Sequence, residues 1–350
     1  MVAPLDPTPL LTFYPALIGQ PVTPMAGGLI NDTFAVGTGA VLQRLHRIFT
    51  PAVNLDIDAL VPPLRAAGVP VPALIRTGEG ALYVEVEAGP LAGCWRLMTR
   101  LPGRMIHRVT TDAVAGVAGQ TLARFHDALR SVDHTFQFTR PGAHDTDAHM
   151  ARLASAVTHW PHHRLYGPVA ALAEALHARW TALGGESPGL PLRIVHGDPK
   201  VANLLFEGPD DAPTVSAVLD LDTMAWATLE VELGDALRSW CSVSTESDAT
   251  ASFDAGRFEA AVAGYVSVAG PWLLEAELRS FGPGTERICL ELAARFAADA
   301  LEESYFGWDP TVAPARGEHN LLRARNQWAL AGSVAAQRDA LEAITARLGR

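Results

Sequence analysis

The stretch His196-Gly197-Asp198-Pro199-Lys200-Val201-Ala202-Asn203 decides which fold and chemistry this chain can have. It follows a short apolar strand at 194–195 and precedes the apolar run Leu204-Leu205-Phe206. Its glycine and proline interrupt regular structure, so the stretch is predicted to be a loop that joins two strands. A carboxylate, an ammonium group and an amide therefore stand close together in one loop.

Phosphoryl transfer to an alcohol needs such a set, because a base must orient the attacking hydroxyl and metal ions must neutralise the phosphates. We predict that Asp198 orients the acceptor hydroxyl and that Lys200 counters charge on the transferred phosphoryl group. Asn203 is predicted to ligate Mg²⁺ through its amide oxygen, since Mg²⁺ prefers oxygen ligands. The spacing matches the catalytic-loop pattern H-x-D-x-x-x-x-N of protein kinases.

Lys200 is the only lysine among the 350 residues, and every other basic side chain is arginine or histidine. Lysine is a compact point charge, whereas arginine is a broad planar fork. A lone lysine inside this loop therefore indicates a position where arginine does not serve, although one stray lysine can also arise by chance.

A second acidic segment, Val218-Leu219-Asp220-Leu221-Asp222-Thr223, closes the apolar strand predicted at 215–218. A carboxylate at the end of a neighbouring strand can reach the same metal ion as the first loop. We predict that Asp220 is the main metal ligand. Asp222 is predicted either to support that ligand or to bind a second ion.

The rest of the chain divides into a strand-rich part and a helical part. Residues 1–100 are predicted to form an N-lobe with an antiparallel sheet and one helix, and residues 101–350 a mainly helical C-lobe. The predicted N-lobe elements are strands at 25–36, 40–45, 69–75, 81–86 and 94–101 and a helix at 52–67. The predicted C-lobe helices cover 111–130, 145–183 and most of the chain after 233.

Composition excludes several classes of protein. Hydrophobic residues make up 49% and charged residues 19% of the chain, which supports real cores and argues against disorder. The net charge of -11 gives no general attraction for nucleic acid or anionic lipid, so neither is a predicted partner. No basic residue precedes Arg44 and no long apolar run occurs, so we expect a cytoplasmic protein. The three cysteines are too scattered for a metal pair or a disulfide framework.

Several motifs together resemble the aminoglycoside phosphotransferase and choline kinase superfamily, namely the 196–203 loop, the Asp220 strand end and Gly234-Asp235. A narrower similarity is to bacterial N-acetylhexosamine 1-kinases. It rests on Gly28-Leu-Ile-Asn-Asp-Thr-Phe34, Val41-Leu-Gln-Arg-Leu45, Leu219-Asp-Leu-Asp-Thr223, Gly234-Asp-Ala-Leu-Arg238, Arg295-Phe-Ala-Ala-Asp299, Tyr305-Phe306 and His319-Asn-Leu-Leu-Arg-Ala-Arg325. The resemblance implies a bilobal, protein-kinase-like α+β fold, ATP as phosphoryl donor and Mg²⁺ as cofactor.

On the nucleotide side, Gly27 and Gly28 would let the backbone approach the phosphates. The kinase pattern expects a lysine on the third strand, and this chain has none. Arg44 is our preferred replacement, because its fork can bind phosphate, and Gln43 is the alternative. The segment Met98-Thr99-Arg100 resembles the hinge that contacts adenine through backbone groups.

On the acceptor side, the resemblance implies that Arg295 and Tyr305 contact a sugar. Arg295 could equally form an ion pair within its helix, for instance with Glu291 four residues earlier. Asn31 and Asp32 follow the predicted glycine turn, and we predict that they reach the acceptor or order that turn.

These observations predict an ATP-dependent kinase whose acceptor is a small sugar or amino sugar, with transfer to the anomeric hydroxyl of an N-acetylhexosamine or related hexose. One alternative is a kinase for an aminoglycoside, choline, homoserine or another small alcohol. A third possibility is a pseudokinase that only binds nucleotide. The acceptor, the choice of ATP over GTP and the oligomeric state stay open.

Overall fold

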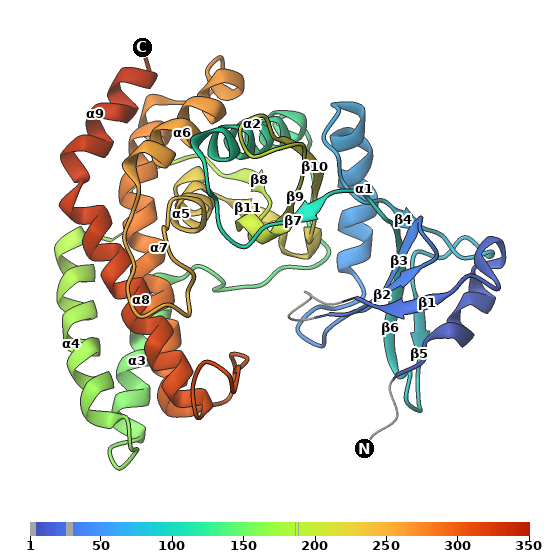
Figure 1. Cartoon of the computed structure of the whole chain (residues 1–350), viewed down its shortest axis with the longest axis horizontal. Coiled ribbons are helices and arrows are strands. Elements are labelled where there is room, and N and C mark those ends of the chain that lie inside the picture. Colours follow the sequence, from blue (N-terminus) through green and yellow to red (C-terminus); the bar gives the residue numbers. More distant parts are fainter. Residues whose placement is uncertain (1–4, 26–30, 186, 188) are drawn as a thin grey trace.

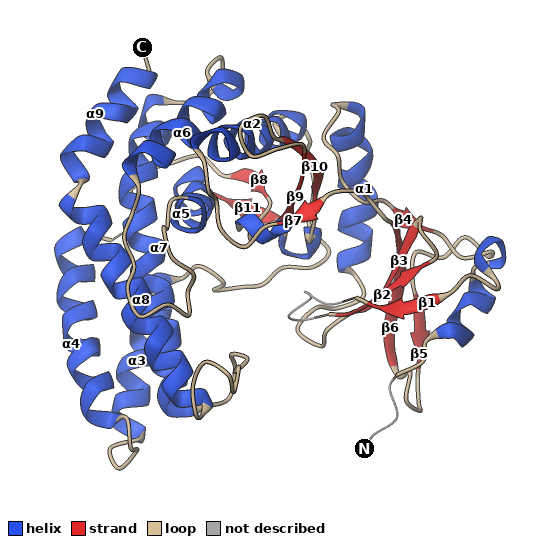
Figure 2. Cartoon of the chain, viewed as in Figure 1, coloured by secondary structure: helices blue, strands red, loops and turns tan. Residues whose placement is uncertain are grey.

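Two lobes make up the chain in the computed structural model, which describes residues 5–25, 31–185, 187 and 189–350. A small lobe built on a sheet lies at one side and a larger lobe of helices at the other (Figure 1). Figure 2 shows one group of strands in the small lobe and a second group in the larger lobe, on the side toward the small lobe. The predicted α+β arrangement, with an antiparallel N-lobe sheet and a mainly helical C-lobe, is confirmed.

The N-lobe sheet is antiparallel, with the strand order β1-β2-β3-β6-β4, and β5 also pairs with β6. Of the strand predicted at 69–75, only the last two residues join the sheet, because Val69 and Val71 pack in the core of the C-lobe instead. The strands are β1 (Val22–Pro24), β2 (Asp32–Val36), β3 (Ala40–Arg44), β4 (Leu74–Ile75), β5 (Val84–Val86) and β6 (Gly93–Thr99).

The two faces of this sheet have different neighbours, because side chains alternate along each strand. Leu42 and Trp95, both fully buried, face a small core that they share with the short helix η1 (Thr8–Phe13). Gln43 and Arg96 come next along their strands and are paired in register. They therefore lie on the opposite face, which is turned toward the C-lobe.

Helix α1 (Val53–Ala66) lies between the sheet and the C-lobe. Its buried residues Ile57, Leu60 and Leu64 belong to the large hydrophobic core of the C-lobe, not to the small core of the sheet. The two lobes are thus joined through packing as well as through the chain, and a domain boundary near residue 100 stays a prediction.

Two small sheets in the C-lobe, on its side toward the N-lobe, determine where the predicted site residues lie (Figure 1). The 196–203 loop joins β8 to β9, and the 219–224 loop joins β10 to β11. Because β8 pairs with β11 and β9 with β10, both loops run between the same two sheets and are held side by side. The strands are β7 (Arg104–Met105), β8 (Arg193–Val195), β9 (Leu204–Glu207), β10 (Thr214–Val218) and β11 (Ala225–Ala227).

The C-lobe is built from helices packed around one another. The helix predicted at 145–183 is wrong in one respect: the chain turns at Trp160-Pro161, because proline cannot continue a helix, and two helices result. The helices are α2 (Asp112–Leu129), α3 (Thr146–His159), α4 (Tyr166–Leu183), α5 (Leu229–Trp240), α6 (Ala255–Ala269), α7 (Glu275–Glu302), α8 (Arg316–Ala336) and α9 (Arg338–Leu348).

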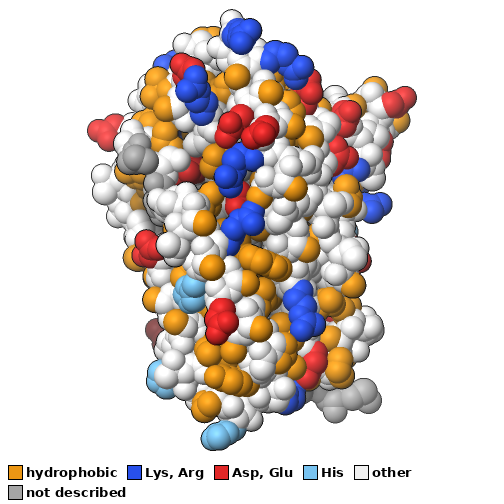
Figure 3. Space-filling view, turned by 90° about the vertical axis from the view of Figure 1, so that its left-hand side faces the viewer, with side chains coloured by type: hydrophobic (Ala, Val, Ile, Leu, Met, Phe, Trp, Pro, Cys, Tyr) orange, Lys and Arg blue, Asp and Glu red, His pale blue; other side chains and the backbone are white. Residues whose placement is uncertain are grey.

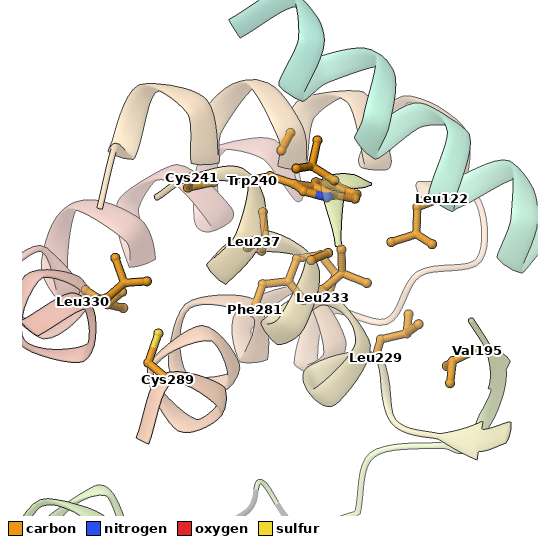
Figure 4. Packing of buried hydrophobic residues seen from close by; sticks show 14 of the residues in the cluster. Leu122, Val195, Leu229, Leu233, Leu237, Trp240, Cys241, Phe281, Cys289 and Leu330 are labelled. Atoms are coloured by element: carbon orange, nitrogen blue, oxygen red, sulfur yellow. The ribbon is translucent and has the colours of Figure 1, made fainter. Parts of the chain in front are cut away.

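Helix α5 lies in the centre of this lobe. Leu229, Leu233 and Leu237 recur at four-residue spacing, so they form one face, and they pack with Trp240 and with Phe281 of α7 (Figure 4). This packing fixes α5 directly beneath the 196–203 loop, since Trp240 Nε1 donates a hydrogen bond to Pro199 O at 2.9 Å.

On the outer helical face of the C-lobe, acidic and basic side chains are interspersed (Figure 3). Ion pairs also join helices of the C-lobe, for example Arg347 of α9 with Glu259 of α6. Within the part of the chain that the structure describes, none of the helices has the length and apolar character needed to cross a bilayer.

Candidate active site

The 196–203 and 219–224 loops are hydrogen-bonded to each other where the two lobes meet. Leu219 N donates to Asn203 O at 2.8 Å, and Thr223 Oγ1 donates to His196 O at 2.9 Å. His196 Nε2 lies 2.7 Å from Leu219 O. These bonds hold the two ends of one loop against the two ends of the other.

Gly197 makes this close approach possible. Its φ is +80°, a left-handed conformation, and a Cβ atom at this position would lie 2.2 Å from Thr223 O. Glycine is the residue that tolerates both conditions. The glycine of the motif thus serves the packing of the two loops.

A buried carboxylate on α5, Glu232, supports the backbone of the first loop. It accepts hydrogen bonds from His196 N and Gly197 N, each at 3.0 Å, and lies 3.3 Å from His126 Nε2. Burial raises the pKa of Glu232, but the hydrogen bond and charge of His126 and the other donors outweigh it, so the pKa is lowered. Our sequence reasoning missed Glu232. The available signal was its position three residues after Leu229, which places an acidic side chain on the apolar face of α5.

Asp198 is held by two other residues of its own loop. Lys200 Nζ donates to Asp198 Oδ2 at 2.5 Å, and Asn203 Nδ2 donates to the same oxygen at 3.2 Å. Burial raises the pKa of Asp198, but the charge and hydrogen bond of Lys200 outweigh it, so the pKa is lowered. The side chains of Asp198 and Lys200 are 27% and 32% exposed. The carboxylate is therefore ionised at neutral pH and accessible to a substrate.

Asp220 has an unusual backbone and an unusual carboxyl group. Its φ of 62° and ψ of 55° are left-handed, which is uncommon for a residue with a side chain, although Asp adopts this conformation more readily than most. Burial, with the charges of Asp222 and Asp198, raises the pKa of Asp220 to about 6. The negative charge at Asp220 is thus poorly compensated by the protein alone.

Asn203 and Asp220 offer oxygen atoms that suit Mg²⁺. Asn203 directs Nδ2 at Asp198, which leaves Oδ1 as the acceptor end of its amide. A cation beside Asp220 would stabilise the ionised form of its carboxyl group. Mg²⁺ is commonly held by one or two protein groups together with substrate phosphates, so these residues fit the ion.

Asp222 is bound by side chains of the N-lobe. Its carboxylate is fully buried and accepts hydrogen bonds from Arg96 Nη2 at 2.8 Å and from Asn31 Nδ2 at 3.2 Å. The predicted metal role of Asp222 stays a prediction, but its oxygens already have partners. Sequence reasoning missed Arg96, although an arginine between Trp95 and Leu97 in an apolar strand was a sign of a buried charge.

Arg44, the predicted phosphate ligand, lies on the opposite face of the sheet from Gln43 and Arg96. It forms an ion pair with Asp32 at 2.6 Å, and its Cζ lies 5.5 Å from the centre of the Trp95 ring. The structure therefore brings neither Arg44 nor Asp32 to the two loops. The predicted glycine turn at Gly27 and Gly28 lies outside the described residues.

The predicted hinge lies at the end of β6. Met98 is buried, and the backbone N–H groups of Thr99 and Arg100 donate to Ala73 O and Gly39 O, each at 2.9 Å. These two N–H groups are therefore occupied within the N-lobe. A contact between adenine and this segment stays a prediction, and it would have to use other backbone groups.

The predicted acceptor residues lie near one another at the end of α7. Arg295 Nη1 is 3.6 Å from Glu291 Oε1, so the ion pair within the helix exists, and its Cζ lies 5.8 Å from the centre of the Phe306 ring. Tyr305 is 46% exposed, and its hydroxyl accepts a hydrogen bond from Arg140 Nη2 at 3.3 Å. Arginine and tyrosine groups are thus gathered at this edge of the C-lobe.

Electrostatic coupling connects this edge to the 196–203 loop. Burial lowers the pKa of His144, but its hydrogen bond to Glu291 and the charges of Glu291 and Asp235 outweigh it and raise the pKa. Burial also lowers the pKa of Lys200, and carboxylates led by Asp198 and including Asp235 raise it overall. Asp235 therefore lies within electrostatic reach of both groups.

Comparison with known proteins places the chain in a family. Its residues 21–270 match the model of the phosphotransferase enzyme family, and the chain belongs to that family. A protein of Deinococcus radiodurans, described only as uncharacterized, is 30% identical over 195 residues, which span 53% of each chain. A homoserine kinase of Pseudomonas aeruginosa strain UCBPP-PA14 is 28% identical over 266 residues, or 75% of each chain. The match thus spans about half the length of the first relative and three quarters of the second.

Solved structures show the same fold. A microcompartment-associated aminopropanol kinase is 18% identical with a TM-score of 0.61, covering 97% of this chain and 98% of the other. The amicoumacin kinase hAmiN, in complex with AMP-PNP, Ca²⁺ and Ami, is 15% identical with a TM-score of 0.62 over 92% of both chains. The predicted kinase-like fold is thereby confirmed, and so is the predicted class, a phosphotransferase that acts on a hydroxyl group.

Proposed function

We propose that this protein transfers the γ-phosphate of ATP to the anomeric hydroxyl of a small sugar, an N-acetylhexosamine or a related hexose. The observation that carries the proposal is the convergence of Asp198, Asn203 and Asp220 from two loops that hydrogen-bond to each other. These bonds bring groups suited to phosphoryl transfer into two adjacent loops, and we propose that Arg295 and Tyr305 contact the acceptor.

In the proposed reaction, Asp198 orients the sugar hydroxyl and accepts its proton while the hydroxyl oxygen attacks the γ-phosphorus in line. A new oxygen–phosphorus bond forms as the bond between the γ-phosphorus and the bridging oxygen of ADP breaks. The lowered pKa of Asp198 keeps its carboxylate ionised and able to accept a hydrogen bond from the hydroxyl. Lys200, which donates to Asp198, supplies positive charge beside the transferred group.

Asn203 and Asp220 would hold Mg²⁺ together with the nucleotide phosphates, and an ion bound there neutralises phosphate charge during transfer. The raised pKa of Asp220 supports this assignment, because the site disfavours a carboxylate without a counter-charge. The two loops that carry these residues are already held together, because Leu219 N donates a hydrogen bond to Asn203 O.

The preference for a sugar rests on the acceptor edge and on the resemblance of residues 295–299 and 305–306 to N-acetylhexosamine 1-kinases. Arg295 and Tyr305 carry donors suited to sugar hydroxyls and ring substituents. A site built to bond hydroxyls rejects analogues that lack them, because its own polar groups are then left without partners.

A second candidate is an amino-alcohol acceptor. It is favoured by the similarity to a homoserine kinase over three quarters of the chain. Homoserine presents a primary hydroxyl with an ammonium group nearby. The Asp235 carboxylate acts electrostatically on Lys200 and is itself paired with Arg238 at 2.9 Å.

An acceptor panel tests these proposals. N-acetylglucosamine, N-acetylgalactosamine, glucose, homoserine, choline and kanamycin would each be incubated with Mg²⁺ and ATP, and phosphorus NMR would identify the product. We expect a sugar 1-phosphate. Phosphorylation of homoserine without any sugar would establish the second candidate. ATP binding without product from any of these acceptors would favour a non-catalytic nucleotide-binding protein.

We also propose that the protein works in the cytoplasm, where ATP is available. Cys94, Cys241 and Cys289 carry free thiols, which suits a reducing compartment.

A further inference from the structure

A buried arginine of the N-lobe sheet, Arg96, reaches the 219–224 loop. It is 2% exposed, and its Nη1 and Nη2 donate to the two carboxylate oxygens of Asp222 at 2.5 and 2.8 Å. Its Nε and Nη2 also donate to Gln43 Oε1 at 3.2 and 2.9 Å, and its Nη1 donates to Asn54 Oδ1 at 3.4 Å. One guanidinium thus joins β3, α1 and the second loop of the site.

Every donor of this guanidinium is in use. An arginine side chain has five N–H donors, and the contacts to Asp222, Gln43 and Asn54 account for all of them. No donor is left for a phosphate oxygen. Gln43 on the third strand and Asn54 on the following helix are neutral, whereas the kinase pattern has a lysine and a glutamate on those two elements.

Asp222 is equally engaged. Both of its oxygens bond to Arg96, and one of them also accepts from Asn31 Nδ2 at 3.2 Å. Asn31 Oδ1 in turn accepts from His46 N at 2.8 Å, so a second segment of the N-lobe joins the same carboxylate. All of these donors come from the N-lobe. Asp220, two residues earlier, has no such pairing with Arg96.

We propose that Arg96 is a positioning residue that fixes the N-lobe sheet and α1 to the 219–224 loop through Asp222. In this arrangement Asp222 is the counter-ion of Arg96, and the metal-binding oxygens are those of Asn203 and Asp220. The Arg96–Asp222 pair ties the sheet, the helix and the loop together, as the lysine–glutamate pair ties the sheet and the helix in kinases. This inference rests on the proposed phosphoryl transfer. It adds an explanation of how the two lobes of the protein are held in position relative to each other.

The first test compares the two aspartates by nucleotide binding, which requires no acceptor. AMP-PNP binding would be measured by calorimetry with and without Mg²⁺ for wild type, Asp220→Asn and Asp222→Asn. We expect Asp220→Asn to lose the enhancement by Mg²⁺ and Asp222→Asn to keep it. An equal loss in both variants would overturn the proposal, because Asp222 would then be a metal ligand.

The second test is a double-mutant cycle on turnover. Arg96→Gln and Asp222→Asn should each lower kcat by about 100-fold, the loss typical of a small misplacement of reacting groups. Because both act through one pair, the double variant should lose no more than the worse single variant. Arg76→Gln is the matched control, since Arg76 pairs with Asp58 of α1 at 2.7 Å in a solvent-exposed position; it should leave kcat unchanged.

Losses that multiply in the double variant would contradict the proposal. If Arg96→Gln alone fails to fold, the double replacement Arg96→Met with Asp222→Leu removes both buried charges and should fold. We expect it to bind nucleotide weakly and to turn over slowly, and wild-type turnover would show that the ion pair has no positioning role. Absence of nucleotide binding in the wild type would instead refute the proposed function.

Discussion

At the scale of single residues, Asp198 Oδ2 receives hydrogen bonds from both Lys200 and Asn203. These donors favour the ionised carboxylate, which is the form that the proposed role of Asp198 requires. The same three residues stand within one loop, which is why their chemistry could be predicted before the fold was known.

Replacing Asp198 by Asn should lower kcat by about 10²–10⁴-fold, because the amide cannot accept the hydroxyl proton. Nucleotide affinity should change little, since the amide keeps the size of the side chain. Steady-state kinetics and calorimetry with AMP-PNP would measure both quantities. Asp127→Asn, on the exposed surface of α2, is the control, and turnover of Asp198→Asn within tenfold of that control would refute the assigned role.

Asp220 should make the metal-free protein less stable as the pH rises. Its pKa in the folded state is about 6, above the ordinary aspartate value of 3.8, so its contribution to stability is fully present below pH 3.8 and is lost as the pH rises through about 6. Asp220→Asn should therefore stabilise the metal-free protein at pH 7.5 by up to about 3 kcal/mol. Below pH 3.8 the two proteins should be equally stable.

Urea unfolding in EDTA across this pH range would measure the difference in the free energy of unfolding. Mg²⁺ with nucleotide should reverse the order at pH 7.5, because the ion binds the ionised carboxylate of the wild type. A variant that is less stable than wild type in EDTA at pH 7.5 would contradict the proposed charge balance.

At the scale of elements, α5 holds the 196–203 loop through Glu232, and the apolar face of α5 holds Glu232 in place. Glu232→Gln substitutes an N–H₂ group for one acceptor oxygen, so either His196 N or Gly197 N loses its partner. We expect a loss of about 1–3 kcal/mol in stability and a lower kcat with little change in the KM for ATP.

Hydrogen exchange at His196 and Gly197 would test this role directly, and both amides should exchange faster in the variant. Glu275→Gln on α7 is the matched control, because that side chain is 72% exposed. Unchanged exchange in the loop would show that Glu232 does not position it.

At the scale of the whole molecule, the N-lobe sheet and the C-lobe have separate main hydrophobic cores among the described residues. The core of the sheet contains Leu42 and Trp95, whereas α1 and the C-lobe helices share the larger core. Local unfolding of the N-lobe sheet therefore need not unfold the C-lobe. Residues 196–203 and 219–224 belong to the C-lobe, which has the larger core.

Leu42→Ala should cost about 2–5 kcal/mol, and this cost should fall on the sheet. Hydrogen exchange should accelerate in β2, β3 and β6 while the amides of α7 stay protected. Leu290 is equally buried but lies in the larger core. Leu290→Ala should therefore also accelerate hydrogen exchange in the C-lobe helices. Equal acceleration in β3 and α7 of Leu42→Ala would show that the molecule opens as one unit.

Much of the fold could be predicted because its signals are local. The alternation of residues 32–36 and 40–44 and the apolar spacing of residues 112–129 mark strands and helices within short windows. Short strands were predicted less accurately. The strand predicted at 69–75 is shorter in the structure because Val69 and Val71 pack in the core of the C-lobe. That competition is decided by residues far away in the sequence.

Some residues of the candidate site could likewise be predicted from local sequence, whereas others could not. The sequence by itself determined Asp198, Lys200 and Asn203 as a set, because they lie in one loop, and indicated Asp220 because it ends a neighbouring strand. Only the tertiary structure decided that Arg96, not Arg44, faces the loops and that Asp222 is bound to it, since sheet register and strand alternation select the face. The Arg96–Asp222 contact joins positions 126 residues apart, and no local pattern specifies which buried charge finds which partner.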